Sequence, residues 1–165
     1  RTHRNIVPEV TSVIKISGAA ELKEGMIEVG GQSSGTFGKS LAEGGGSSFN
    51  IAALGGYVFS ENIEFRGALS YNKASGADGS GGLVAGADYL WPNRRGPWMP
   101  YAGGGIGVSF GQGSDGIGLI HGGVRYFFND QLSASIEGKY QFGFSHIGDG
   151  TIEAGVTLSY YFDHF

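Results

Sequence analysis

Nine ionisable side chains are the residues of this sequence that could do chemistry together. They stand at alternate positions within stretches rich in glycine and apolar residues, and they are Glu28, Glu64, Arg66, Asp88, His121, Arg125, Glu137, Lys139 and Glu153. Acids and bases in such a set suit a buried ionic network, because carboxylates accept charge-assisted hydrogen bonds from arginine and lysine. Re-pairing within the network would gate a conductance, whereas a fully paired network would act as a plug. We favour the plug.

Other kinds of site have little support in the sequence. His3, His121 and His164 are far apart and lack the helical spacing of zinc motifs, so no metal site is predicted. The glycine-rich runs at 43–46 and 103–105 lack a following GK[ST] motif, which argues against a phosphate-binding loop. Without cysteine there is no thiolate ligand or nucleophile, and a net charge of −4 gives no nucleic-acid footprint. We expect no cofactor.

The elements that must position the ionisable residues are strands with two unlike faces. The stretch 151–162 shows the pattern best: one parity reads Ile152, Ala154, Val156, Leu158, Tyr160, Phe162, and the other reads Thr151, Glu153, Gly155, Thr157, Ser159, Tyr161. A period of two is that of a β-strand. Eight stretches of this kind leave few residues to cover their apolar faces. The sequence therefore predicts an all-β fold, an eight-stranded antiparallel up-and-down transmembrane β-barrel with a short N-terminal extension.

Composition agrees with a barrel in lipid. No run approaches 18 apolar residues, so no transmembrane helix is expected. A mean hydropathy of −0.07 suits a barrel, because lumen-facing and lipid-facing residues cancel along each strand. The expected strands are 26–37, 48–60, 62–73, 82–92, 98–110, 116–128, 131–145 and 150–162.

The connections between these strands fall into two groups. Tight turns at 60–62 and 129–130 and a longer link at 92–97 are expected on the periplasmic side, where connections are short. Gly/Ser-rich connections at 39–47, 74–81, 111–115 and 146–149 would be extracellular loops. They are short for that side, and small-residue loops offer a poor surface for a large partner.

Aromatic residues gather at the strand ends on the outward parity. The periplasmic set is Tyr57, Phe59, Tyr89, Trp91, Trp98, Tyr126, Phe128, Tyr160 and Phe162. Phe49, Tyr71, Phe110, Phe142 and Phe144 fall at the opposite ends. Two aromatic belts are typical of a barrel that meets two membrane interfaces. Core aromatics of a soluble sandwich are the alternative, although these need not sort to strand ends.

Four motifs resemble the small outer-membrane barrel family related to OmpA and OmpX. They read IEVGG at 27–31, LGGYVFSENI at 54–63, PYAGGGIG at 100–107 and VRYFFNDQL at 124–132, followed by a closing YYF at 160–162. The resemblance covers residues 25–165 and identifies a fold more than an activity. It implies an integral protein of the bacterial outer membrane, in contact with lipid and lipopolysaccharide, with a periplasmic N-terminus.

The same resemblance implies a recognition signal for the barrel-assembly machinery near the C-terminus. Its residues are Gly155, Leu158, Tyr160, Phe162 and Phe165. Family members usually end at the aromatic residue that closes the last strand. Here Asp163, His164 and Phe165 follow Phe162, so either aromatic could serve.

An outer-membrane lipid A deacylase with eight strands is the enzymatic alternative. Its motif is Phe-x-His-x-Ser-Asn, and this chain has Phe144 and His146 at the matching positions. Gly148 stands where the nucleophilic serine belongs, and Asp149 stands where the asparagine belongs. Because a base-activated hydroxyl is essential to such a mechanism, we expect no catalysis.

An eight-stranded barrel has an interior just wide enough for side chains, so no open pore is expected. If the hairpin around 73–82 is symmetric about residue 77, Arg66 stands directly opposite Asp88 and forms an ion pair with it. The predicted role is therefore structural or interactive, with a narrow gated channel as the alternative. A soluble lipocalin-like barrel would need the reverse parity, with an apolar lumen.

Residues 1–24 lie outside the strand pattern. We expect a periplasmic lead-in here, available to a protein partner, ahead of the barrel at 25–165. The chain starts without a charged-then-apolar leader, which suggests that a secretory signal has been removed.

Overall fold

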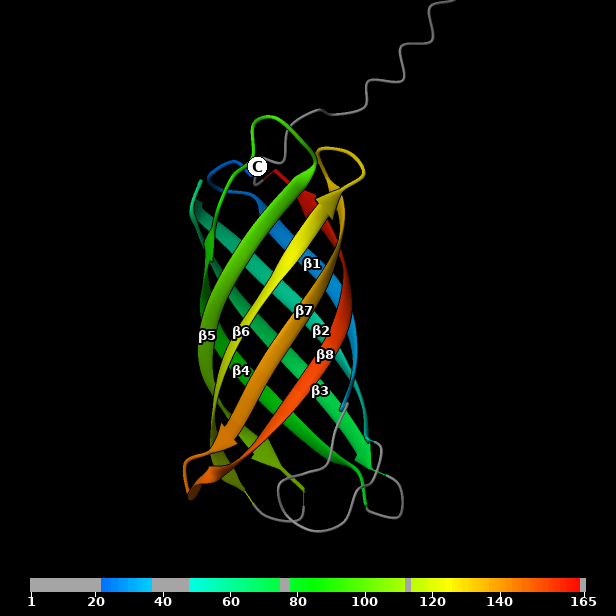
Figure 1. The fold of residues 1–165 in the computed structure, drawn as a ribbon, viewed down its shortest axis with the longest axis vertical. Helices are drawn as coiled ribbons and strands as arrows, with labels where there is room; N and C mark the ends of the chain where they lie inside the picture. The colour runs from blue at the N-terminus through cyan, green and yellow to red at the C-terminus, as the bar shows by residue number, and fades with distance from the viewer. Residues whose placement is uncertain (1–21, 37–47, 75–77, 112–113, 164–165) are drawn as a thin grey trace, which may run out of the picture.

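The computed structural model describes residues 22–36, 48–74, 78–111 and 114–163, which form a closed barrel of eight antiparallel strands (Figure 1). The strands are β1 (Ile27–Thr36), β2 (Ser48–Ser60), β3 (Ile63–Ala74), β4 (Ser80–Leu90), β5 (Trp98–Phe110), β6 (Asp115–Phe127), β7 (Leu132–Gly143) and β8 (His146–Phe162). Each strand pairs with its neighbour in the chain, and β8 closes the barrel by pairing with β1, where Ile27 lies opposite Phe162. The predicted fold class is confirmed.

The barrel has two ends that differ in their connections. The turn end carries the links 61–62, 91–97 and 128–131 together with the last residues of β8, and it is at the top of Figure 1. The opposite end, here called the loop end, carries the β7–β8 turn, the last residues of β1, β3 and β5 and the first residues of β2, β4 and β6. The whole of the predicted loop 39–47 and parts of those at 74–81 and 111–115 lie outside the described residues.

For seven of the eight strands, the expected bounds differ from the observed ones by at most two residues at each end. The exception is β8, because the loop predicted at 146–149 is wrong. Only Phe144 and Ser145 separate β7 from β8, so β8 begins at His146. The pairing shifts register there, from Gln141 opposite Thr151 to Gly143 opposite His146. Between these two pairs β8 has the four residues 147–150 and β7 has only Phe142, so β8 starts with a bulge in a glycine-rich segment that had no strand signal of its own.

Strand β8 shows how the two faces separate. Ile152, Val156 and Leu158 are exposed on the outside by 69%, 57% and 57%, whereas Glu153 and Thr157 are buried in the lumen at 4% and 1%. An apolar exterior around a polar interior is the arrangement of a barrel in lipid. A lipocalin-like barrel would have the opposite arrangement.

Glycine lets side chains fit inside the narrow barrel. A Cβ on Gly103 in β5 would collide with Asp88 Oδ1 and with the carbonyl oxygen of Ala87 on β4. Its absence makes room for the Asp88 carboxylate at the wall of the lumen.

None of the described residues belongs to a helix long and apolar enough to cross a membrane.

Candidate functional site

Three zones follow one another along the lumen, and we call them the apolar plug, the ionic layer and the cavity. The ionic layer consists of Glu28, Glu64, Arg66, Asp88, His121, Arg125 and Glu137. The apolar plug lies at the turn end and consists of Leu22, Met26, Val58, Leu90, Met99, Tyr101, Phe127 and Tyr161. The ionic layer follows in the middle of the barrel, and the cavity lies beyond it toward the loop end. Eight of the nine predicted ionisable residues have side chains at most 10% exposed, and the ninth, Lys139, is 12% exposed.

The segment before β1 completes the apolar plug. The chain turns at 23–26, where the Met26 amide donates to the Lys23 carbonyl at 3.2 Å and Gly25 adopts a φ of +88°. The Gly25 amide then donates to the Val58 carbonyl at 2.8 Å. This turn places Leu22 inside the barrel end with no exposed surface. Leu22, within the predicted lead-in, therefore belongs to the core, whereas Lys23 and Glu24 are exposed; residues 1–21 lie outside the described part of the chain.

Arg125 anchors the side of the ionic layer next to the plug. Its Nη1 and Nη2 atoms both donate to Glu64 Oε2 at 3.1 Å, and its side chain is 1% exposed. The guanidinium lies between two aromatic rings, 5.0 Å from the Tyr101 centroid and 5.4 Å from the Tyr161 centroid. Cation–π contacts of this kind strengthen when they are removed from water.

Arg66 links three carboxylates from three other strands. Its Nη1 atom donates to Asp88 Oδ2 at 2.8 Å and lies 3.6 Å from Glu137 Oε2, while its Nε atom is 3.2 Å from Glu28 Oε2. The predicted contact between Arg66 and Asp88 is present.

The register predicted for that contact is wrong. Arg66 lies opposite Gly86, and Asp88 lies opposite Glu64. Arg66 therefore reaches Asp88 along the diagonal, which its long side chain permits because diagonal neighbours are about 7–8 Å apart. The β3–β4 hairpin sets this register, and the observed pairing is not symmetric about residue 77.

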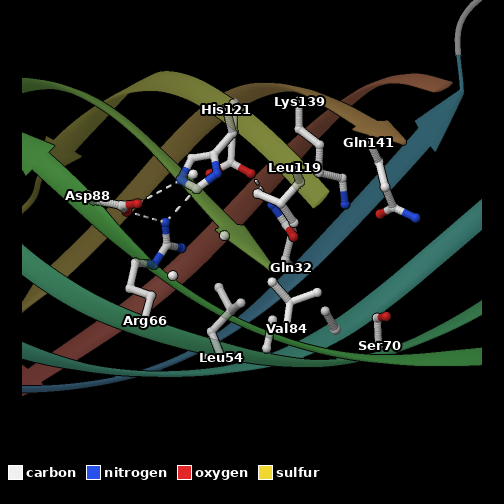
Figure 2. Close-up of a pocket in the computed structure, with 17 residues that line it drawn as sticks. Gln32, Leu54, Arg66, Ser70, Val84, Asp88, Leu119, His121, Lys139 and Gln141 are labelled. Carbon is white, nitrogen blue, oxygen red and sulfur yellow. Dashed lines mark hydrogen bonds and ion pairs between the residues drawn. The ribbon is translucent and has the colours of Figure 1, made fainter. Parts of the chain in front are cut away.

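His121 and Tyr101 complete the hydrogen-bond network of the ionic layer. His121 Nε2 is 2.7 Å from Asp88 Oδ1, and Figure 2 shows the side chains of His121 and Arg66 converging on Asp88. The Tyr101 hydroxyl donates to Glu137 Oε2 at 2.8 Å, and the Gln32 amide donates to Glu137 Oε1 at 2.9 Å. The network thus joins residues of β1, β3, β4, β5, β6 and β7.

Lys139 and Glu153 form a separate pair nearer the loop end. Lys139 Nζ lies 3.0 Å from Glu153 Oε2, and the Ser34 hydroxyl donates to the same oxygen at 2.9 Å. Glu153 is therefore satisfied from both adjacent strands.

The cavity beyond the ionic layer has a volume of about 70 Å³. Leu54, Val84 and Leu119 line it together with Gln32, Lys139 and Gln141, as Figure 2 shows. A water molecule needs roughly 10–15 Å³ of such space, so the cavity has room for several. Arg66, Asp88 and His121 also line it, so it ends on the ionic layer.

Sequence reasoning did not name Tyr101, Tyr161 and Gln32 among the site residues, nor Leu22 and Met26. A signal for Tyr101 and Tyr161 existed, because both stand on the inward parity of their strands. No such signal existed for Leu22, which precedes the first strand.

The predicted aromatic girdle residues lie on the outside at the turn end. Their rings pack edge to face, with centroid distances of 5.0 Å for Tyr89–Trp91, 4.7 Å for Trp98–Tyr126 and 5.2 Å for Tyr126–Phe128. Tyr126 and Phe162 are half-buried and the other members are exposed.

The residues assigned to the assembly signal do not share one face. Leu158 and Tyr160 point outward, with exposures of 57% and 46%. Gly155 faces inward, and a Cβ there would lie 2.8 Å from the Ser34 Cβ. Phe165 lies outside the described residues.

The described residues offer few groups for the two alternative sites, a deacylase-like catalytic site and a metal site. Ser145 donates its hydroxyl to Asp115 Oδ1 at 2.8 Å, so this hydroxyl is already engaged. The side chains of residues 146–149 lie outside the described set. Among the described residues, no group of three or more His, Asp or Glu side chains is arranged to hold a metal ion.

Comparison with known proteins places the fold. No protein-family model and no curated protein matches the chain. Among solved structures, the N-terminal β-barrel domain of Pseudomonas aeruginosa OprF matches with a TM-score of 0.65 and 17% identity, over 86% of this chain and 100% of that one. Neisserial surface protein A matches with a TM-score of 0.63 and 18% identity, over 82% and 99%.

A designed transmembrane β-barrel also matches, with a TM-score of 0.58 and 14% identity over 86% of this chain and 99% of the design. The two natural neighbours are eight-stranded outer-membrane barrels. At such low identities the likeness concerns the fold: the chain has the architecture of a small transmembrane β-barrel.

Proposed function

We propose that this protein is an integral outer-membrane β-barrel whose own side chains close the lumen, and that its role is structural or interactive. The observation that carries the proposal is the succession of two filled zones across the lumen. In the apolar plug all eight side chains are at most 6% exposed. In the ionic layer Arg125, Glu64 and Glu28 are at most 1% exposed.

The exterior supports a lipid partner. Ile106, Ile136 and Ile152 are exposed by 68%, 71% and 69%, and they belong to an apolar surface that covers the strands. Contiguous apolar surface of this extent indicates contact with a membrane or a partner. The girdle at the turn end provides the aromatic residues that favour a membrane interface. We infer contact with outer-membrane lipid, including lipopolysaccharide.

The orientation we propose places the turn end in the periplasm. Two of the three links at this end, 61–62 and 128–131, are tight, and periplasmic connections of such barrels are short. Leu22 and Met26 enter the barrel from the same end, so residues 1–21 would begin in the periplasm, where a protein partner could bind them. The barrel-assembly machinery would read the outward residues of β8.

Electrical recordings test whether the lumen is closed. The refolded protein in planar lipid bilayers is expected to show no steady conductance. A Tyr101→Ala/Arg125→Ala double variant should conduct, because both side chains cross the lumen. Arg94→Ala is the matched control, since Arg94 is 71% exposed. Steady conductance of the unaltered protein would contradict a closed lumen. Brief openings that Arg66→Ala abolishes would instead favour a gated channel.

Fractionation and gel mobility test the membrane assignment. The protein should require detergent for extraction and should change its mobility on heating, as the barrel unfolds only when heated. Solubility without detergent would contradict the proposal.

We propose no enzymatic activity. Incubation with lipid A should yield no deacylated product, and His146→Ala should behave like the unaltered protein. Deacylation lost in that variant would establish the enzymatic alternative.

A further inference from the structure

Two buried glutamates face each other across Gly56. Glu28 on β1 and Glu64 on β3 have no exposed surface, and Gly56 on β2 lies between them in the sheet. Glu28 Oε2 and Glu64 Oε1 lie 2.8 Å and 3.1 Å from the point that a Cβ on Gly56 would occupy. The missing side chain therefore leaves a space into which both carboxyl groups turn.

The two oxygens that converge on this space lack a hydrogen-bond donor. Glu28 Oε1 accepts from the Ser159 hydroxyl, and Glu64 Oε2 accepts from both Nη atoms of Arg125. By contrast, Glu28 Oε2 and Glu64 Oε1 are fully buried without a hydrogen bond. Arg66 Nε approaches Glu28 Oε2 at 3.2 Å but does not form a hydrogen bond with it. Buried acceptors without donors are rare in folded proteins.

The ionic layer also contains more acids than bases. Four carboxyl groups, those of Glu28, Glu64, Asp88 and Glu137, face two guanidinium groups, those of Arg66 and Arg125. Lys139 adds no base to this layer, because it pairs with Glu153 nearer the loop end. Even an imidazolium at His121 leaves one negative charge in excess. A buried excess charge is costly, and such groups take up a proton instead.

We propose that Glu28 and Glu64 form a proton-binding site, in which one proton lies between Glu28 Oε2 and Glu64 Oε1. One carboxylic acid O–H then donates to the facing carboxylate oxygen and supplies the missing donor. The proton comes from water, and no other bond is made or broken. Like charges in one site cannot both form easily, so two adjacent carboxyl groups keep one proton between them.

Charged and titratable groups surround the pair on every side. Arg66 and Arg125 favour ionised carboxylates, whereas Asp88, opposite Glu64, favours the protonated state. Tyr161 lies opposite Glu28 on β8, and its buried hydroxyl has no partner. Tyr101 and Glu137 reach the pair only through Arg66 and Arg125. Because two cations already offset two of the four acids, one shared proton leaves the layer close to neutral when His121 is charged.

Infrared spectroscopy tests the proposal on the intact protein in lipid. The C=O stretch of a protonated carboxyl group is separate from the carboxylate bands. At neutral pH we expect such a band, which shifts when the glutamates carry ¹³C in the carboxyl group and disappears at high pH. Its absence at neutral pH, or its failure to shift with labelled glutamate, would overturn the proposal.

Two variants assign the band. Glu64→Gln and Glu28→Gln should each abolish it, because an amide replaces the neutral acid and its N–H can donate to the remaining carboxylate. Glu61→Gln, at an exposed glutamate on the β2–β3 turn, should leave it unchanged. A band that persists in both variants would belong to another buried carboxyl group, such as that of Glu137 or Glu153, and would overturn the assignment.

Stability against pH provides a second readout. The unfolding midpoint of the unaltered protein should fall as the pH rises through loss of the shared proton, because the folded state binds a proton that the unfolded state releases. In Glu64→Gln this fall should be absent. If neither glutamine variant inserts into lipid, the Gly56→Ala variant is used for the infrared test in their place, since its Cβ would separate the two oxygens. An unchanged band in that variant would contradict the shared proton.

Discussion

Arg125 directs both terminal nitrogens to one carboxylate oxygen of Glu64, across the lumen from β6 to β3, at 3.1 Å each. Neither side chain is more than 1% exposed. The two residues are 61 positions apart in sequence and share no strand pair. This contact therefore ties together opposite parts of the wall, at the level where the apolar plug meets the ionic layer.

Removal of the arginine should destabilise the barrel strongly. Arg125→Met leaves the Glu64 carboxylate buried without its main partner, and breaking such a pair costs about 3–5 kcal/mol. Unfolding by guanidinium in lipid vesicles would measure the change. Arg94→Met is the control, because the exposed Arg94–Glu61 pair should contribute less than about 1 kcal/mol. Equal stability of the two variants would show that the buried pair contributes no more to the unfolding free energy than the exposed pair.

Leu22, in the turn before β1, should contribute as much to the unfolding free energy as a buried residue of a strand. Leu22→Ala is expected to cost about 2–5 kcal/mol, the usual cost of a cavity at a fully buried leucine. Lys23→Ala, one residue further along and exposed, should change the unfolding free energy by about 0.5 kcal/mol at most. The same vesicle assay applies. If Leu22→Ala unfolds like the unaltered protein, the lead-in does not belong to the core.

Two glycine substitutions should differ sharply. A Cβ at Gly86 would collide with the Gly104 carbonyl oxygen and lie 2.9 Å from Gly105 Cα, so Gly86→Ala must push β4 away from β5. Overpacking of this kind typically costs about 1–3 kcal/mol. A Cβ at Gly138 meets nothing within 4 Å, so Gly138→Ala should be tolerated. Comparable heat-induced shifts in gel mobility for both variants would contradict the close approach of β4 and β5.

A charge on the outward face should be costly only within the membrane. Val156→Arg places a cation on the apolar exterior near the middle of β8, and the cost at the bilayer midplane is about 2–4 kcal/mol. Asp163→Arg, just beyond the last strand, should have little effect on folding into vesicles. If both substitutions fold equally well, the exterior does not face hydrocarbon.

Much of the barrel was predictable because strand periodicity is a local property. The alternation around Glu153 and Val156 assigns one face to the lumen and the other to the exterior, without knowledge of any partner strand. The inward polarity of Glu28, Glu64, Arg66 and Arg125 follows from the same rule. The predicted loop at 146–149 was wrong, because β8 begins at His146, which pairs with Gly143 across a bulge that the local pattern does not show.

The sequence by itself determined the number of strands and which of their faces is polar, since the period of two repeats along the chain. Only the tertiary structure decided which inward residues meet. Arg66 binds Asp88 along a diagonal, Glu28 faces Glu64 across Gly56, and Leu22 enters the turn end. These contacts depend on register and on the distance across the lumen, and both are fixed by how the strands pair around the whole barrel.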